Sequence, residues 1–157
     1  MEQTTFPVTQ IPLQVLLADD NIDDRYFFEI ILRAFPGPTQ LVMVEDGEKL
    51  MTYLSENSNN LPDVLFLDLN MPGKNGSECL SEIKNNPELK HLPVIIYSAA
   101  VHNDVADQLY NKGAHYYFRK TDMIEIQNVL HHVLALLIKN NFERPTRQRF
   151  VLSLAVE

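Results

Sequence analysis

The chain alternates between short apolar segments and longer segments whose apolar residues recur at helical spacing, and this alternation restricts the fold more than any other feature. Short apolar runs bounded by polar residues predict buried strands. Five such runs occur, at residues 14–18, 41–45, 63–69, 93–98 and 115–120. Several are apolar without interruption, which is typical of a parallel sheet covered by helices on both faces. We therefore predict an α/β fold with a doubly wound, five-stranded parallel sheet.

Helix signals fall between the predicted strands. The first helix is expected over Ile22–Ala34, because its apolar residues recur at helical spacing and the sequence PGP follows shortly after. Asp, Ser and Asn side chains satisfy the free backbone N–H groups at a helix start. The remaining helices are therefore expected to begin near Asp46, Ser77, Asn103 and Asp122. The predicted domain body spans residues 14–140, after an N-terminal arm of residues 1–13.

Charged and hydroxyl side chains stand at the carboxyl ends of the predicted strands. Asp19 and Asp20 follow the first strand, Asp68 lies at the end of the third, and Ser98 and Lys120 end the fourth and fifth. Ligands of doubly wound sheets bind at this edge. Two bare carboxylates at ~4 Å repel by roughly 4 kcal/mol at an effective dielectric near 20, and a hard cation with oxygen ligands removes that cost. Asp68 is then a candidate nucleophile toward phosphorus.

Four motifs, ADD, LFLDLNMPGKNG, IIYSAA and GAHYYFRK, together resemble the receiver domain of bacterial two-component response regulators, the chemotaxis-regulator-like fold. The resemblance covers residues 14–140 and implies the strand order 2-1-3-4-5. It implies that Asp68 is the phosphoacceptor and that Mg²⁺, or Mn²⁺, is bound at this site. Asp20 and Asp68 are the expected direct ligands, Asp19 is expected to act through water, and Asn70 is expected to contribute its backbone carbonyl.

The same resemblance implies a conformational switch. Ser98 corresponds to the switch hydroxyl, Lys120 to the partner of the phosphoryl group, and Tyr117 to an aromatic side chain that changes rotamer. One position departs from the family, because Thr121 follows the lysine where proline is common. We therefore expect the loop after the last strand to contain only trans peptide bonds.

Each of these residues also has a simpler explanation. Asp19 and Asp20 suit the positive end of a helix dipole, but the other charged strand ends favour a functional cluster. Asp23 and Asp24 are interpreted only as first-turn helix charges. Tyr117 is compatible with an ordinary core position as well as with the switch.

Three classes of function fit the cluster. The favoured one is a single-domain response regulator that accepts a phosphoryl group from a histidine kinase or phosphotransfer protein and signals to a downstream protein. It is not an enzyme, apart from its own phosphorylation and dephosphorylation. The first alternative is a degenerate receiver that acts as a scaffold. The second is a phosphatase of the haloacid-dehalogenase type, which expects a second acid two residues after the nucleophile, where this chain has Asn70.

The composition of the chain indicates its cellular compartment and excludes some classes of binding partner. The formal net charge of −8 disfavours direct nucleic-acid binding. No apolar run is long enough to span a membrane, and MEQTTFPVTQIP lacks the features of a signal peptide. A single cysteine, Cys79, allows no internal disulfide and suits a reducing compartment. We expect a cytoplasmic protein.

The C-terminal extension, residues 141–157, is too short for an effector domain. Its sequence RFVLSLAV is apolar and has high strand propensity. Leaving this surface in water is unfavourable, at about 25 cal/mol per Å². We expect the extension to dock on a receiver body across a homodimer, although docking within one chain would bury the same surface.

Overall fold

A parallel sheet forms the centre of the computed structural model, which describes residues 11–139 and 142–153. Six strands pair in the order β2-β1-β3-β4-β5-β6, and every pair is parallel. The strands are β1 (Leu13–Ala18), β2 (Thr39–Val44), β3 (Val64–Asp68), β4 (Val94–Ser98), β5 (Tyr116–Arg119) and β6 (Val151–Leu152). The predicted α/β class and the order 2-1-3-4-5 are confirmed, and a short sixth strand extends the sheet.

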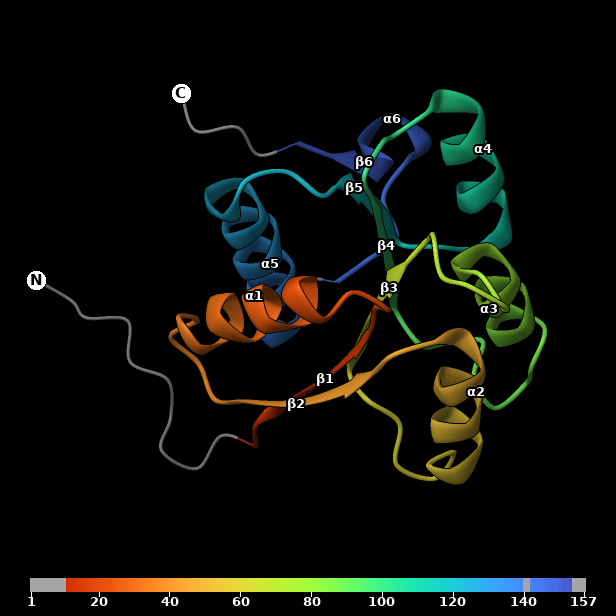
Figure 1. Cartoon of the computed structure of the whole chain (residues 1–157), viewed down its shortest axis with the longest axis horizontal. Coiled ribbons are helices and arrows are strands. Elements are labelled where there is room, and N and C mark those ends of the chain that lie inside the picture. Colours follow the sequence, from red (N-terminus) through yellow and green to blue (C-terminus); the bar gives the residue numbers. More distant parts are fainter. Residues whose placement is uncertain (1–10, 140–141, 154–157) are drawn as a thin grey trace, which may run out of the picture.

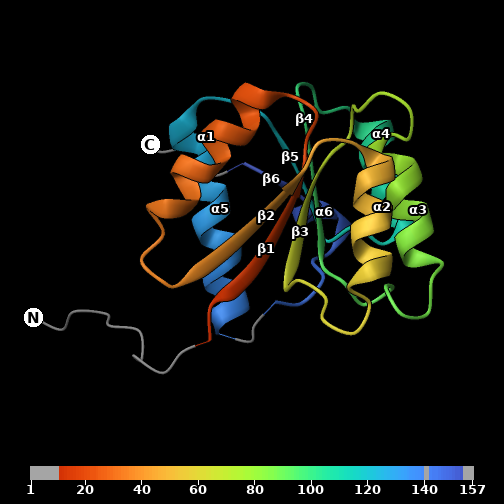
Figure 2. The same ribbon diagram turned by 60° about the horizontal axis from the view of Figure 1, so that its bottom comes forward.

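Helices cover both faces of the sheet, as predicted (Figure 1; Figure 2). One face carries α1 (Ile22–Arg33) and α5 (Met123–Ile138). The other carries α2 (Gly47–Glu56), α3 (Gly76–Lys84) and α4 (Asn103–Lys112), with the short α6 (Arg147–Phe150) beside α4. No helix among the described residues has the length and apolar character needed to cross a membrane.

The core has two halves, because successive side chains of a strand point to opposite faces of a sheet. In β3, Val64 and Phe66 pack toward α1 and α5, whereas Leu65 and Leu67 pack toward α2, α3 and α4. All five residues of β3 are buried. This explains the uninterrupted apolar run in the sequence, since a central strand must be apolar on both sides.

Most helix starts match the predictions, but the start of α3 does not. Asn75, not Ser77, is the N-cap: its side chain accepts a hydrogen bond from Glu78 N–H, and the Glu78 side chain accepts one from Asn75 N–H. Gly76 allows this earlier start, because a Cβ there would lie 2.4 Å from the Asp68 carbonyl oxygen. The prediction of Ser77 was wrong because both residue types favour N-caps and the close approach to β3 is invisible in the sequence.

The C-terminal extension docks on its own chain. β6 pairs with β5, with Val151 opposite Tyr117, and Phe150 is fully buried. The Phe150 ring packs on Tyr110 of α4, with 5.3 Å between the ring centroids. Within one chain the extension therefore buries this surface, which is the alternative that the sequence left open, and a homodimer stays a proposal. Residues 154–157 of the apolar run lie outside the described residues.

Candidate functional site

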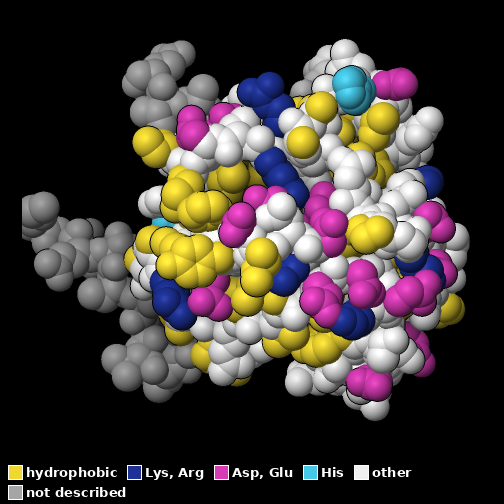
Figure 3. All heavy atoms as spheres, viewed as in Figure 1, with side chains coloured by type: hydrophobic (Ala, Val, Ile, Leu, Met, Phe, Trp, Pro, Cys, Tyr) yellow, Lys and Arg dark blue, Asp and Glu magenta, His cyan; other side chains and the backbone are white. Residues whose placement is uncertain are grey.

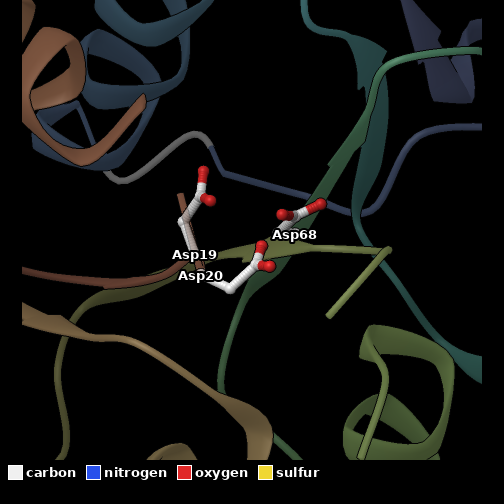
Figure 4. Close-up of side chains that lie close together, drawn as sticks. All are labelled: Asp19, Asp20 and Asp68. Atoms are coloured by element: carbon white, nitrogen blue, oxygen red, sulfur yellow. The ribbon is translucent and has the colours of Figure 1, made fainter. Parts of the chain in front are cut away.

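Three carboxylates meet at the carboxyl edge of the sheet, where β1 and β3 end side by side. Asp19, Asp20 and Asp68 each offer an oxygen, and these oxygens all lie within 4.8 Å of one another. Figure 4 shows the side chains at the two strand ends, with the carboxylate of Asp20 directed toward that of Asp68. Asp19 and Asp68 are buried, whereas Asp20 is exposed. The convergence predicted from the order of the strands is confirmed.

Asp68 is held by two donors. Lys120 Nζ lies 3.2 Å from Oδ2, and the backbone N–H of Asn70 donates to Oδ1 at 3.1 Å. Burial raises the pKa of Asp68 to about 7, assisted by the nearby charge of Asp19, while Lys120 and the Asn70 N–H oppose the rise. A nearby cation favours the ionised form of a carboxyl group. A divalent cation bound here would therefore leave Asp68 as the nucleophilic carboxylate.

Lys120 is shared among three acids. Its Nζ lies 2.9 Å from Asp24, 3.2 Å from Asp68 and 3.3 Å from Asp19. Burial acts to lower the pKa of Lys120, but the hydrogen bond that it donates to Asp24 and the charges of the three carboxylates outweigh burial, so the pKa is raised. The ammonium is therefore charged at neutral pH and offers a fixed positive group beside Asp68.

The interpretation of Asp24 as a helix charge alone was incomplete. Asp23 and Asp24 both lie in the first turn of α1, as predicted, but Asp24 is also the nearest carboxylate to Lys120. The two residues are 96 positions apart in the chain. Its position in the first turn of α1 explains an acid without any partner, so no pattern in the sequence indicates the contact with Lys120.

Tyr97 was not identified from the sequence and lies against the site. Its hydroxyl donates to Oδ2 of Asp19, and its ring stacks on Phe118 with 5.5 Å between centroids. Oδ1 of Asp19 accepts a second hydrogen bond from the backbone N–H of Asn21 at 2.9 Å. In the sequence, Tyr97 is one apolar residue in a strand, so only the register reveals its position.

Ser98 and Tyr117 share one acceptor. The Ser98 hydroxyl donates to the carbonyl of Ala100 at 2.9 Å, and the Tyr117 hydroxyl donates to the same oxygen at 3.1 Å. Both residues are buried, Tyr117 completely. The side-chain amide of Asn70 also donates to Ser98 at 3.3 Å. The two residues predicted to form a switch are therefore linked through the loop that follows β4.

The residues fit a hard divalent cation. The donors are the carboxylate oxygens of Asp19, Asp20 and Asp68, and such oxygen sets suit Mg²⁺. Asp20 is exposed, so one side of the cluster opens to solvent. The peptide bond before Thr121 is trans, as expected, since no cis bond occurs among the described residues.

Residues 15–131 match the family described as the response regulator receiver domain. The chain belongs to this family. The receiver resembles the response regulator Rcp1 of Synechocystis sp., with 32% identity over 115 residues, covering 70% of this chain and 78% of that protein. It also resembles the Arabidopsis thaliana two-component response regulator ARR7, with 33% identity over 100 residues, covering 59% of this chain and 48% of ARR7.

Two solved structures extend the comparison. The phosphorylated cyanobacterial phytochrome response regulator RcpA has a TM-score of 0.75 and 29% identity, covering 83% of this chain and 96% of that one. The Mn²⁺-bound form of Rcp1 has a TM-score of 0.73 and 26% identity, covering 86% and 100%. The protein is thus a response regulator receiver whose acidic pocket is typical of phosphorylation and divalent-cation binding. The scaffold and phosphatase alternatives are not favoured.

Proposed function

We propose that this receiver accepts a phosphoryl group on Asp68 from a histidine kinase or phosphotransfer protein and passes the signal to a downstream protein. The observation that carries the proposal is the environment of Asp68. This carboxylate is buried, two further acids surround it, and a charged lysine lies 3.2 Å away. A structural aspartate has no need of such neighbours, since burying uncompensated charge is costly.

The chemistry follows from the positions of these groups. An oxygen of Asp68 attacks the phosphorus of the donor phosphohistidine, the P–N bond breaks, and the imidazole leaves with the electron pair. Lys120 is near enough to bind an oxygen of the transferred group, which needs mainly positioning and charge stabilisation. Mg²⁺, or Mn²⁺, held by Asp20, Asp68 and the Asn70 carbonyl, and by Asp19 through water, would supply further charge stabilisation.

The output is proposed to begin at Ser98. If its hydroxyl turns to an oxygen of the phosphoryl group, it gives up the Ala100 carbonyl that it shares with Tyr117. A new charge thereby changes the partners of a buried aromatic residue on β5. The surface formed by α4, β5 and α5 is the expected binding site for the downstream protein, because Tyr117 belongs to β5, α4 packs on the same half of the core as Tyr117, and α5 follows β5 in the chain.

A groove beside the site suits a donor protein. It lies between α1 and α5, has a volume of ≈ 250 Å³, and is lined by apolar side chains together with Lys120 and Asp24. Exposed hydrophobic residues continue over α1 and the start of α5 (Figure 3). They are Ile22, Tyr26, Phe27, Met123 and Ile124. Exposed apolar surface of this kind marks interaction sites, and this one adjoins Asp68.

A cytoplasmic location and the absence of direct nucleic-acid binding stay proposals, based on the single cysteine and the net charge of −8.

Labelling with acetyl phosphate tests the phosphoacceptor. Asp68→Asn is expected to abolish labelling, and chelation of divalent cations is expected to do the same to the wild type. Asp63→Asn is the matched control, because Asp63 precedes β3 at its far end, where its side chain accepts a hydrogen bond from the Gln14 N–H at 2.7 Å. Intact-mass spectrometry reports the added phosphoryl group. Label that persists on another residue of the Asp68→Asn variant would contradict the proposal.

A further inference from the structure

Tyr97 stands at the junction of the phosphorylation site and the core. In the sheet register it lies opposite Asp68 on one side and Phe118 on the other, and it directly precedes Ser98. Its side chain packs in the half of the core that faces α1 and α5, and it is only 5% exposed. Burial alone would be satisfied by phenylalanine or leucine, so the hydroxyl group requires its own explanation.

The hydroxyl completes the hydrogen bonding of Asp19. That carboxylate is fully buried. One oxygen accepts from the Asn21 N–H at 2.9 Å, and the other accepts from the Tyr97 hydroxyl and lies 3.3 Å from Lys120 Nζ. Buried carboxylates are stable only when such donors are present. Donors on both oxygens also fix the plane of the carboxylate relative to Asp20 and Asp68.

The ring of Tyr97 contacts the other charged group of the site. Lys120 Nζ lies 4.7 Å from the centroid of the ring, within the range of a cation–π interaction. The ring itself is held by stacking on Phe118. One side chain therefore contacts the acid through its hydroxyl and the lysine through its ring.

We propose that Tyr97 is a positioning residue of the phosphorylation site: its hydroxyl orients Asp19 toward the divalent cation, and its ring supports Lys120. The inference rests on the proposed function. Groups that hydrogen-bond to metal ligands fix their orientation, and their loss typically lowers metal affinity 10–100-fold. If Tyr97 were purely structural, its substitution would change folding stability without a selective effect on cation binding.

The hydroxyl is tested by Mn²⁺ binding without any phosphodonor. Free Mn²⁺ is measured by electron paramagnetic resonance while it is titrated into each protein. Tyr97→Phe is expected to weaken Mn²⁺ binding roughly tenfold, the lower end of the range for such partners. Tyr116→Phe is the matched control, since Tyr116 is also buried, lies on the neighbouring strand β5, and packs its ring on Phe142 instead of on the acids. Equal affinity in Tyr97→Phe and the wild type, with both folded, would overturn the role of the hydroxyl.

The ring is tested by comparing Tyr97→Phe with Tyr97→Leu. At saturating Mn²⁺, labelling by acetyl phosphate is expected to be several-fold slower in Tyr97→Leu than in Tyr97→Phe, because only Tyr97→Phe keeps an aromatic ring beside Lys120. A wild-type rate in Tyr97→Leu would overturn the role of the ring. If Tyr97→Leu fails to fold, the NMR chemical shift of the Lys120 Cε protons provides the second measurement. An aromatic ring beside these protons shifts them upfield, so support by the ring requires the upfield position to persist in Tyr97→Phe. Loss of the upfield position in Tyr97→Phe would overturn the role of the ring. If the wild type is not labelled at all, the proposed function fails, while the Mn²⁺ titration still decides the role of the hydroxyl.

Discussion

At the scale of single residues, the site is a balance of charges around one lysine. Lys120 is closer to Asp24 than to Asp68, so part of its electrostatic interaction is with a residue that has no place in the proposed ligand set. Asp24 is partly exposed and belongs to α1. It therefore competes with an incoming phosphoryl group for the same ammonium.

Asp24→Asn is expected to speed labelling by acetyl phosphate. The substitution removes one negative charge near an anionic donor and frees Lys120 from its nearest partner. A partly exposed ion pair of this kind contributes about 0.2–1 kcal/mol, which corresponds to a rate increase of roughly 1.5- to fivefold. Asp23→Asn is the control, since Asp23 lies in the same helical turn but outside the ion pairs of Lys120. Equal rates for the two variants would contradict this account.

The pKa of Asp68 predicts a pH dependence of stability. The folded-state pKa of about 7 lies above 3.8, the ordinary pKa of an aspartate side chain, so the folded state binds a proton more tightly than the unfolded chain. Stability from this group is complete below about pH 4 and is lost as the pH rises toward about 7. In the metal-free protein, the melting temperature of Asp68→Asn should exceed that of the wild type by more at pH 8 than at pH 5.

Differential scanning fluorimetry in the presence of a chelator provides this measurement. Each pKa unit corresponds to roughly 1.4 kcal/mol, so the difference between the proteins should be several degrees at pH 8. Mg²⁺ should raise the wild-type melting temperature and leave Asp68→Asn nearly unchanged. A difference in melting temperature between the two proteins that does not vary with pH would show that burial of the charged carboxylate is not the cause of the difference.

At the scale of secondary-structure elements, the C-terminal extension is part of the fold. The fully buried ring of Phe150 contacts Tyr110 and lies 6.3 Å from the ring of Tyr117. Arg147 pairs with Asp107 of α4 at 2.6 Å. The Arg144 guanidinium stacks 3.9 Å from the centroid of Tyr110. These contacts join the extension to the same elements that surround the proposed switch residue.

Phe150→Ala is expected to destabilise the protein by about 3–5 kcal/mol, the usual cost of removing a buried phenylalanine ring. Chemical denaturation measures the loss. Amide hydrogen exchange should rise at Val151 and Leu152 before it rises in β1 or β3, because the extension would open first. Gln148→Ala, at an exposed position in α6, is the control. Loss of stability without faster exchange in β6 would mean that the extension is not a separate opening unit.

The sequence predicted the elements and the cluster well, for a physical reason. Strand runs such as residues 63–69 are apolar because both faces are buried, and this constraint is local. The meeting of Asp19, Asp20 and Asp68 follows from chain order once the sheet is parallel. Contacts such as Asp24–Lys120 and Tyr97–Asp19 join residues 96 and 78 positions apart. They depend on side-chain directions that no local pattern specifies.

At the scale of the whole molecule, the extension closes one side of the sheet. β6 covers part of the edge of β5, and Phe150 fills the space beneath it. An uncovered strand edge and an apolar face both promote association. The extension is therefore expected to oppose self-association, the reverse of the homodimer expectation from the sequence.

Deletion of residues 142–157 tests this expectation. The shortened chain should show an apparent mass that rises with concentration, because β5 and the Tyr110 ring become exposed. Light scattering across the working concentration range measures the mass, with the full chain as the reference. A full chain that is dimeric, together with a monomeric deletion variant, would instead support docking across two subunits.

The docked extension also matters for anyone who exchanges receivers between signalling proteins. The family match ends at residue 131, in the middle of α5, but the folded unit continues to β6. A chimera joined at the family boundary would divide a helix and leave Tyr110 and Tyr117 without the aromatic ring that covers them. The useful junction lies after Leu152. The segment that matches the family is therefore shorter than the segment that must be moved for the receiver to fold in a chimera.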